Sequence, residues 1–300
     1  MSLTAPAADS YLELIRRARR EDLGAGDVTS EAAIPADRHG VGTLVFREPG
    51  VLCGMPVVEQ VLSEYDRELT LSDAFPDGSD VSVGRAVGSI SGPLRSLLSA
   101  ERVVLNFLQR LSGIATVTGR YVEAVAQTSV RIYDTRKTTP GWRELEKYAV
   151  RCGGGLNHRH GLFDAVLIKD NHLAALGKSD LAEALTNLVQ KVMQRPEAMG
   201  FIEVEVDSLE QLPSVLGVEG VDMVLLDNMT PQQLSAAVEA RNAAYADKRV
   251  LLEASGNITL DNVRQVAQAG VDRISIGALT HSAKSLDIGF DLNPERTSTR

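Results

Sequence analysis

The stretch that decides the fold runs from Asp134-Thr-Arg-Lys-Thr-Thr-Pro-Gly141 through Asn157-His-Arg-His160 to Lys169-Asp-Asn-His172. Two short apolar runs, Val130–Tyr133 and Ala165–Ile168, lie within and before it and are expected to form strands. Cations alternate with these runs, so they should fall at or near strand ends and in adjoining loops, where an anion site can form. These cations are Arg136, Lys137, Arg159 and Lys169.

The residue types suit a ligand that carries both carboxylates and phosphates. Arginine presents a planar fork of donors that matches such groups in pairs, whereas lysine is a compact charge that can follow a phosphate. The alternative is a solvated surface crossed by salt bridges, which is common for a run of charges. The acids interleaved with the cations leave this alternative open: Asp134, Glu144, Glu146, Asp164 and Asp170.

Composition bounds the class of protein. The 300 residues, 44% hydrophobic and 24% charged, describe a globular chain with room for one large domain and a smaller one. A formal charge of -9 and 4% aromatic residues argue against nucleic-acid and anionic-membrane binding. With no signal-peptide pattern and no apolar run long enough to span a bilayer, we expect a cytoplasmic protein.

The two cysteines, Cys53 and Cys152, lie far apart and lack the spacing of metal ligands. They therefore predict buried thiols rather than a disulfide framework or a zinc site. His158, His172 and His281 fit ordinary core or supporting roles, since no His-Glu-x-x-His pattern is present.

The first hundred residues predict a mixed α/β unit. The strands Thr43–Phe46 and Val51–Cys53 are expected to form a hairpin through Glu48-Pro-Gly50. Gly113 marks the expected end of this unit. The other expected elements are a helix from Tyr11, helices over Pro56–Ser63 and Pro93–Leu111, and strand structure within Val81–Ile90.

Beyond Gly113 strands and helices alternate, which is typical of a parallel sheet covered by helices or of a closed β/α barrel. The expected strands are Val130–Tyr133, Ala165–Ile168, Phe201–Val206, Met223–Leu226, Val250–Leu252 and Ile274–Ile276. The expected helices include Leu181–Met193, Pro231–Ala244 and Leu260–Ala269.

Chemically active residues follow nearly every expected strand, and this favours the barrel. In β/α barrels the carboxyl ends of the strands converge on one face, whereas an open sheet would spread them along a line. The residues at these ends are Arg136, Lys169, Glu203, Glu205, Asp227, Glu253, Ser255 and Gly277.

Several of these positions also fit a purely structural role. Glu203 and Glu205 share one face of their strand, so one of them could be a buried acid paired with a lysine. Asp227 could cap the helix expected near Pro231. The loops at Ser255-Gly256-Asn257 and Gly277-Ala278, each placed before a helix, together match a barrel phosphate site, although one such loop alone is an ordinary turn.

The chain resembles the quinolinate phosphoribosyltransferase family. The resemblance rests on the segments quoted above together with Gly26-Asp-Val-Thr29, Glu101-Arg102, Glu146-Lys-Tyr-Ala-Val-Arg-Cys-Gly-Gly-Gly155, Glu203-Val-Glu205, Leu225-Leu-Asp-Asn228, Glu253-Ala-Ser-Gly-Asn257 and Gly277-Ala-Leu-Thr-His281. It implies an N-terminal α/β sandwich over 1–113, joined by 285–300, and an incomplete seven-stranded β/α barrel over 114–284. Trp142 and His160 depart from the family pattern and affect only local pocket shape.

The resemblance implies transfer of the phosphoribosyl group of 5-phosphoribosyl-1-pyrophosphate to quinolinate, with decarboxylation to nicotinate mononucleotide, in NAD biosynthesis. It implies a homodimer or higher oligomer in which Arg102 reaches the neighbouring subunit's site. Lys137, Lys169, Glu205 and Asp227 would be catalytic, the last two holding Mg2+. The implied substrate-binding residues are Arg102, Thr135, Arg136, Lys137, His158, Arg159, Lys169, Glu205, Asp227, Ser255, Gly256, Asn257, Ile276, Gly277 and Ala278.

Three other functions stay open on the residues alone. A related transferase could use the same phosphate loops with another acceptor. A barrel that only senses phosphorylated anions would account for the cations but not for Glu205 and Asp227. Finally, Lys169 could form a Schiff base with a carbonyl substrate, since neighbouring cations favour the neutral amine.

Overall fold

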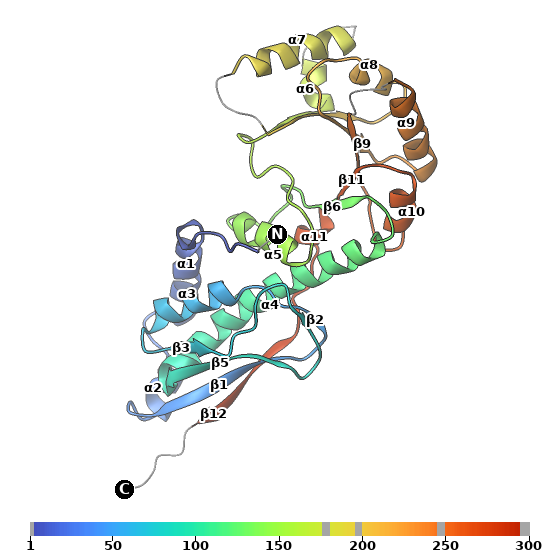
Figure 1. Cartoon of the computed structure of the whole chain (residues 1–300). Coiled ribbons are helices and arrows are strands. Elements are labelled where there is room, and N and C mark those ends of the chain that lie inside the picture. Colours follow the sequence, from blue (N-terminus) through green and yellow to red (C-terminus); the bar gives the residue numbers. More distant parts are fainter. Residues whose placement is uncertain (1–2, 176–180, 196–199, 245–249, 295–300) are drawn as a thin grey trace. The chain divides into compact units, whose positions relative to one another are not determined.

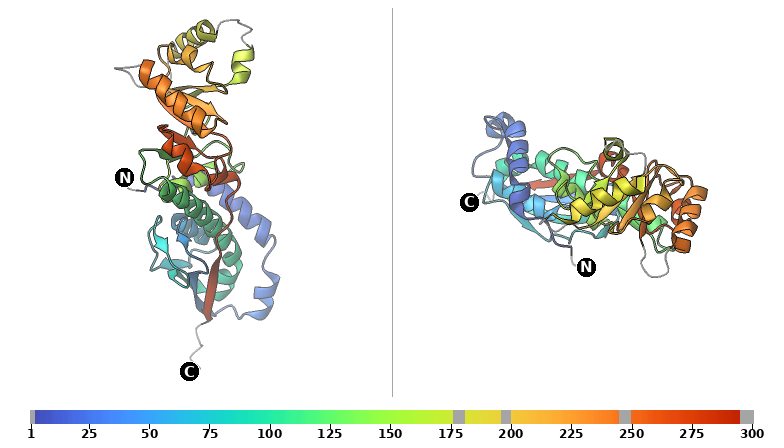
Figure 2. Two further views of the ribbon diagram at one scale, coloured as in Figure 1. Left: turned by 90° about the vertical axis from the view of Figure 1, so that its right-hand side faces the viewer. Right: turned by 90° about the horizontal axis from the view of Figure 1, so that it is seen from above.

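The computed structural model describes residues 3–175, 181–195, 200–244 and 250–294. These residues form two compact units (Figures 1 and 2). The described part of the first unit covers 3–119, 138–154 and 279–294, and that of the second covers 120–137, 155–175, 181–195, 200–244 and 250–278. Within the described residues, no helix combines the length and the apolar character that crossing a membrane requires.

The first unit contains a four-stranded antiparallel sheet in the order β12-β1-β5-β3. Its strands are β1 (His39–Phe46), β3 (Thr70–Ser72), β5 (Ala86–Pro93) and β12 (Ile288–Pro294). Thr43 pairs with Asp291 on one side and with Ser89 on the other. The return of the chain's last strand to this sheet, expected over 287–292, is therefore confirmed; residues 295–300 lie outside the described residues.

The predicted hairpin through Glu48-Pro-Gly50 is wrong. β2 (Gly50–Val51) pairs with β4 (Asp80–Val81) and not with β1. The physical reason is that β12 and β5 already occupy both edges of β1 up to its end, where Phe46 N donates to Arg85 O and Arg47 N donates to Asp287 O. A strand with two filled edges cannot accept a third neighbour.

Helices complete the first unit, and the fourth is much longer than the sequence predicts. α4 runs over Leu94–Ala124 and passes through Gly113, where the sequence suggested a boundary. A Cβ at Gly113 would lie 1.9 Å from Lys284 O, so this glycine admits another part of the chain against the helix instead of ending it. The remaining helices are η1 (Ala8–Ser10), α1 (Leu12–Leu23), α2 (Val28–Ala33), α3 (Met55–Tyr65), α5 (Arg143–Cys152) and α11 (Ala278–His281), which begins at the last residue of the second unit.

α5 belongs to the first unit although it lies within the range 114–284 expected for the barrel. Tyr148 Oη donates to Asp77 Oδ2 at 2.8 Å, and Arg110 forms an ion pair of 2.7 Å with the buried Glu146. The same helix brings Cys152 close to Cys53, 99 positions earlier in the chain, beside Asp77. Both thiols are free and buried as expected, and burial together with the neighbouring Cys152 raises the pKa of Cys53.

The second unit contains a six-stranded parallel sheet in the order β6-β11-β10-β9-β8-β7. All six expected strands are confirmed: β6 (Arg131–Tyr133), β7 (Val166–Ile168), β8 (Ile202–Val206), β9 (Met223–Asp227), β10 (Leu251–Ser255) and β11 (Arg273–Ser275). The helices of this unit, including the two predicted to the residue, are α6 (Asp170–Ala175), α7 (Leu181–Met193), α8 (Leu212–Leu216), α9 (Pro231–Ala244) and α10 (Val263–Gln268).

This sheet curves as a barrel does, with α7, α8 and α9 on its outer side (Figure 1), but it is not closed. Among the described residues β6 and β7 are the two edges and do not pair with each other. An isolated parallel bridge between Tyr133 and Leu156 stands beside β6, where a seventh strand would lie. The incomplete β/α barrel is thus confirmed, while the fully closed barrel considered from the alternation alone is not.

Candidate active site

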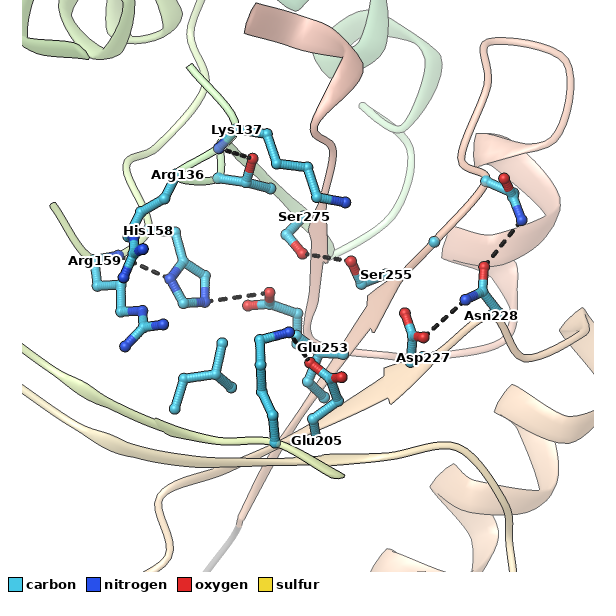
Figure 3. Close-up of a pocket in the computed structure, with 16 residues that line it drawn as sticks. Arg136, Lys137, His158, Arg159, Glu205, Asp227, Asn228, Glu253, Ser255 and Ser275 are labelled. Atoms are coloured by element: carbon cyan, nitrogen blue, oxygen red, sulfur yellow. Dashed lines mark hydrogen bonds and ion pairs between the residues drawn. The ribbon is translucent and has the colours of Figure 1, made fainter. Parts of the chain in front are cut away.

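A cavity of 530 Å³ opens in the second unit, at the carboxyl ends of its parallel strands (Figure 3). It gathers most of the residues that the sequence placed at strand ends, with cations and acids facing one space. The lining residues are Thr135, Arg136, Lys137, His158, Arg159, Leu167, Lys169, Glu205, Leu225, Asp227, Asn228, Glu253, Ser255, Gly256, Asn257 and Ser275.

Four of the predicted site residues do not line this cavity. Ile276, Gly277 and Ala278 follow β11, and Ile276 N donates to Tyr133 O at 2.9 Å. Arg102 is an exposed residue of α4 in the first unit. Their predicted contacts with substrate stay predictions.

A buried aspartate organises the cationic side of the cavity. Asp134, which has no exposed surface, accepts hydrogen bonds from Asn157 Nδ2 at 2.6 Å and from His158 N at 2.8 Å. It thereby fixes the segment that carries Arg159 beside the end of β6. Burial and the nearby charge of Arg136 both lower the pKa of Arg159. Two guanidinium groups close enough for one to lower the pKa of the other favour an anionic ligand between or beside them.

His158 leads from the cavity into a buried ionic network. Its Nε2 lies 2.9 Å from Glu203 Oε2 and 3.4 Å from Glu253 Oε1, and Arg273 Nε lies 3.0 Å from the other Glu253 oxygen. Burial opposes the charged imidazole, but the two carboxylates outweigh it and raise the pKa of His158 to about 9. The Arg159 N–H approaches Nδ1 at 2.8 Å, which favours the neutral ring and works against this rise.

The network separates the two acids of β8. Glu203 is fully buried and faces His158, and burial followed by the charge of Glu253 raises the pKa of Glu203. Glu205 is partly exposed in the cavity, where Lys169 Nζ donates to its Oε2 at 2.5 Å. The structural alternative for one of the two acids thus holds for Glu203, with a histidine in place of the expected lysine partner.

On the opposite side, Asp227 and a glycine loop line the cavity (Figure 3). Asn228 Nδ2 donates to Asp227 Oδ2 at 2.7 Å, and Asn257 Nδ2 donates to Asn228 Oδ1 at 2.9 Å. Gly256, with φ +91°, allows this contact, because a Cβ there would lie 2.2 Å from Asn228 Oδ1. Ser275 Oγ supports the loop by donating to Ser255 Oγ at 3.1 Å.

Several lining residues were not assigned to the site from the sequence. Leu167 precedes Lys169 by two positions, and Leu225 precedes Asp227 by two. Residues two apart on a strand share a face, so this spacing could have placed both leucines in the cavity. Glu253, which the sequence placed at a strand end, also lines the cavity. Asn228 and Ser275 lie at strand ends too, but their short polar side chains carry no comparable signal.

Two groups of potential metal ligands lie within the described residues. One is Cys53, Asp77 and Cys152, and the other is His158, Glu203 and Glu253; in each, the ligand atoms lie within 4.8 Å of one another. Asp77 already accepts hydrogen bonds from Gly54 N, Met55 N and Tyr148 Oη, so it serves as a cap for α3. In the second group, Glu253 already forms an ion pair with Arg273.

Most of the chain matches two family descriptions. Residues 27–112 match the model "Quinolinate phosphoribosyl transferase, N-terminal domain", and residues 114–291 match the model of the C-terminal domain of the same family. The chain is 45% identical over 288 residues to the nicotinate-nucleotide pyrophosphorylase [carboxylating] of Mycobacterium leprae, covering 95% of this chain and 98% of that protein.

Two further relatives agree with these matches. Quinolinate phosphoribosyltransferase [decarboxylating] 1b of Nicotiana tabacum is 39% identical, covering 94% of this chain and 82% of its own. The solved structure of the nicotinate-nucleotide pyrophosphorylase from Francisella tularensis has a TM-score of 0.87 at 35% identity, covering 98% of this chain and 99% of that one.

Proposed function

The chain belongs to the quinolinate phosphoribosyltransferase family, and we propose that it transfers the phosphoribosyl group of 5-phosphoribosyl-1-pyrophosphate to quinolinate with loss of CO2. The products are nicotinate mononucleotide, pyrophosphate and CO2, and the reaction serves de novo NAD biosynthesis. One observation carries the proposal: a single cavity joins a cationic side to two acids and a glycine loop. The lining residues concerned are Arg136, Lys137, Arg159, Lys169, Glu205, Asp227 and Ser255–Asn257.

The cationic side suits the pyridine substrate. Quinolinate carries two adjacent carboxylates, and 5-phosphoribosyl-1-pyrophosphate is more strongly anionic, so the two reactants repel each other in water. Arg136 and Arg159 offer paired donors for carboxylates, and Lys169 adds a charge from the end of β7. Donors that are already in place where charge must be held usually lower the reaction barrier more than any other effect of an active site.

The leucines of the cavity give the pyridine ring an apolar surface. Leu167 and Leu225 line the same space as the cations. A flat ring that carries charged groups on one edge needs both kinds of surface, and binding pockets commonly combine them. We assign these two side chains to the ring and the cations to its carboxylates.

The opposite side suits the phosphoribosyl donor. The glycine loop Ser255–Asn257 precedes α10, and backbone N–H groups of such loops bind phosphate. We assign Glu205 and Asp227 to the ribose hydroxyls, whose hydrogen bonds their carboxylates would accept. We assign Lys137, at the end of the turn that follows β6, to the pyrophosphate. The backbone N–H of Lys137 donates to Thr135 Oγ1 at 3.0 Å, which fixes the turn.

Glu205 and Asp227 would also hold Mg2+. Both offer carboxylate oxygens to the cavity, the ligand type that Mg2+ takes from proteins alongside substrate phosphates. Each carboxylate is oriented by a neighbour, since Lys169 holds Glu205 at 2.5 Å and Asn228 holds Asp227 at 2.7 Å. When bound, Mg2+ would neutralise charge on the departing pyrophosphate.

The proposed reaction has two stages. In the first, the bond between the anomeric carbon and pyrophosphate breaks, and the pyridine nitrogen forms the new bond to that carbon. Glu205 and Asp227 stabilise the positive charge that develops on the ribose. In the second, the ring nitrogen is cationic, so the bond from C2 to its carboxylate can break with its electron pair left on C2. CO2 departs and a proton replaces it.

We also propose that the enzyme is a homodimer or higher oligomer in which Arg102 completes the neighbouring subunit's site. Arg102 is exposed on α4 and is not among the described residues that line the cavity, which supports this assignment. The cytoplasmic location stays a prediction.

The direct test is product analysis by proton NMR. Purified protein would be incubated with 5-phosphoribosyl-1-pyrophosphate, Mg2+ and either quinolinate or nicotinate. We expect nicotinate mononucleotide to form in the incubation with quinolinate and not in the one with nicotinate. Turnover of nicotinate would assign the cavity to a transferase with another acceptor, and binding without turnover of either substrate would favour a sensor.

A further inference from the structure

We propose that Asn228 and Asn257 are positioning residues that couple the glycine loop to the Asp227 carboxylate. Their two side-chain amides form a hydrogen-bonded chain from the loop to Asp227 Oδ2, which we call the amide relay (Figure 3). The inference deepens the proposed function and rests on it. It assigns Asn228 a role and gives Asn257 a role beyond that of a loop residue.

The geometry of the relay is directional. Asn257 Nδ2 donates to Asn228 Oδ1 at 2.9 Å, and Asn228 Nδ2 donates in turn to Asp227 Oδ2 at 2.7 Å. Asn228 therefore uses its carbonyl oxygen for the loop side and its amide nitrogen for the carboxylate side. A shift of Asn257 changes the rotation of Asn228, and with it the direction of the second Asp227 oxygen, Oδ1.

The backbone is shaped to hold the relay. Asn228 and Asn257 have positive φ values of 55° and 50°, a region that asparagine enters more readily than most residues. Asn228 N donates to Ser255 O at 2.9 Å, which continues the pairing of β9 with β10 and seats Asn228 against Gly256. A Cβ on Gly256 would lie 2.2 Å from Asn228 Oδ1, so the missing side chain makes room for the relay amide.

The loop end of the relay is itself anchored. Asn262, the residue before α10, donates from Nδ2 to Asn257 O at 3.0 Å and accepts from Thr259 N at 2.8 Å. Asn257 therefore belongs to an anchored loop, the one to which the proposed function assigns the sugar phosphate. Binding there would hold the loop, the relay and the Asp227 carboxylate in the arrangement that these hydrogen bonds already define.

The consequence is a linkage between two parts of one substrate. Filling the loop with the 5'-phosphate should strengthen Mg2+ binding at Asp227, because the carboxylate is then already oriented. Linkage of this kind is reciprocal, so Mg2+ should strengthen sugar-phosphate binding by the same factor. Residues that orient a metal ligand commonly contribute about 10- to 100-fold in metal affinity or activity.

The test uses Asn228→Gly and Asn257→Gly in the full chain. Glycine accepts the positive φ at both positions, so each variant removes an amide without straining the backbone. Asp73→Gly is the matched control, since Asp73 also has a positive φ, of 51°, but lies in the first unit. Calorimetry would give the Mg2+ dissociation constant with and without ribose 5-phosphate, and steady-state assays would give kcat and KM.

We expect ribose 5-phosphate to strengthen Mg2+ binding to the wild type and to Asp73→Gly, and this gain to fall by about 10-fold in either asparagine variant. The double variant should resemble the single ones, because breaking either link disconnects the same chain. Three results would each overturn the relay. Ribose 5-phosphate could fail to strengthen Mg2+ binding to the wild type, or could still strengthen it fully in Asn228→Gly. The third is a double variant in which the losses of the two single variants multiply. If any of these contradicting results appears while the wild type turns over quinolinate, the relay fails and the proposed function stands.

Discussion

Lys169 Nζ lies 2.5 Å from Glu205 Oε2, so a cation at the end of β7 is paired with an acid of the adjacent strand β8. This relationship bears on the role of the lysine. An ammonium group held by a carboxylate is not a nucleophile, so the Schiff-base alternative loses support. An anionic ligand that enters the cavity would instead share Lys169 with Glu205, as expected of a residue that positions a substrate carboxylate.

Replacing Lys169 should mainly affect turnover. We expect Lys169→Ala to lower kcat by about 100-fold or more, the range found when a preset donor to reaction charge is removed. Lys169→Arg keeps the charge and should retain part of the activity. Lys191→Ala, at an exposed position of α7, is the matched control. Unchanged turnover in Lys169→Ala would remove this residue from the mechanism.

Gly256→Ala should weaken binding of the phosphoribosyl donor. The new Cβ would lie 2.2 Å from Asn228 Oδ1 at a φ of +91°, so both the loop and Asn228 must move. Strain of this kind costs about 1–3 kcal/mol, which corresponds to a rise of roughly 5- to 160-fold in KM for 5-phosphoribosyl-1-pyrophosphate.

Gly84→Ala separates the backbone effect from the clash. Gly84 has a φ of +79° but nothing within 4 Å of its added Cβ. We expect this control to lose thermal stability and keep the wild-type KM. Equal KM values in the two variants would mean that the space at Gly256 has no part in donor binding.

The stability contributed by His158 should depend on pH. Since the carboxylates raise its pKa from 6.5 to about 9 in the folded protein, this contribution is fully present below 6.5 and is lost as the pH rises through about 9. Urea unfolding of wild type and His158→Gln should therefore differ more at about pH 6 than at about pH 10. His39→Gln, an exposed histidine, is the control.

A stability difference between wild type and His158→Gln that grows as the pH rises would contradict the charged network. A difference between wild type and His158→Gln that is constant with pH would mean that the ring stays neutral throughout. The hydrogen bond from Arg159 N to Nδ1 would then dominate over the two carboxylates.

Mixing two inactive variants tests the action of Arg102 across a subunit interface. Arg102→Ala and Lys169→Ala should each be nearly inactive alone. After subunit exchange, a mixed dimer would hold one site free of both substitutions, so up to about a quarter of wild-type activity should return. No recovery in a mixture whose exchange is shown by tagged subunits would place Arg102 in its own subunit's site or outside any site.

The architecture of the second unit was readable from the sequence because its strands are short, apolar and separated by helices of regular period. Each strand end carries a polar residue, and the parallel arrangement alone brings those ends together. The strand pairing of the antiparallel unit was harder to predict from the sequence. A local turn signal at Glu48-Pro-Gly50 suggested a hairpin, but the partners of β1 come from β5 and β12, and pairing over such a separation leaves no local signature.

Within the site, the residue types predicted which residues gather in the cavity better than they predicted individual contacts. Lys169 and Asp227 were recognisable as charged groups after strands. The burial of Glu203 beside His158 was not, because two carboxylates on one strand face differ only in depth, which the surrounding fold decides. The relay through Asn228 depends on a positive φ and on the space at Gly256, and neither can be read from composition or spacing.

The most direct measurement of the central claim follows carbon and phosphate together. Quinolinate labelled at the 2-carboxylate would be incubated with the protein, 5-phosphoribosyl-1-pyrophosphate and Mg2+, and labelled CO2 and pyrophosphate would be counted over time. The proposed chemistry predicts one CO2 for each pyrophosphate, with no label left in nicotinate mononucleotide. Pyrophosphate release without CO2, or equal turnover of nicotinate, would show that the cavity does not couple phosphoribosyl transfer to loss of the 2-carboxylate.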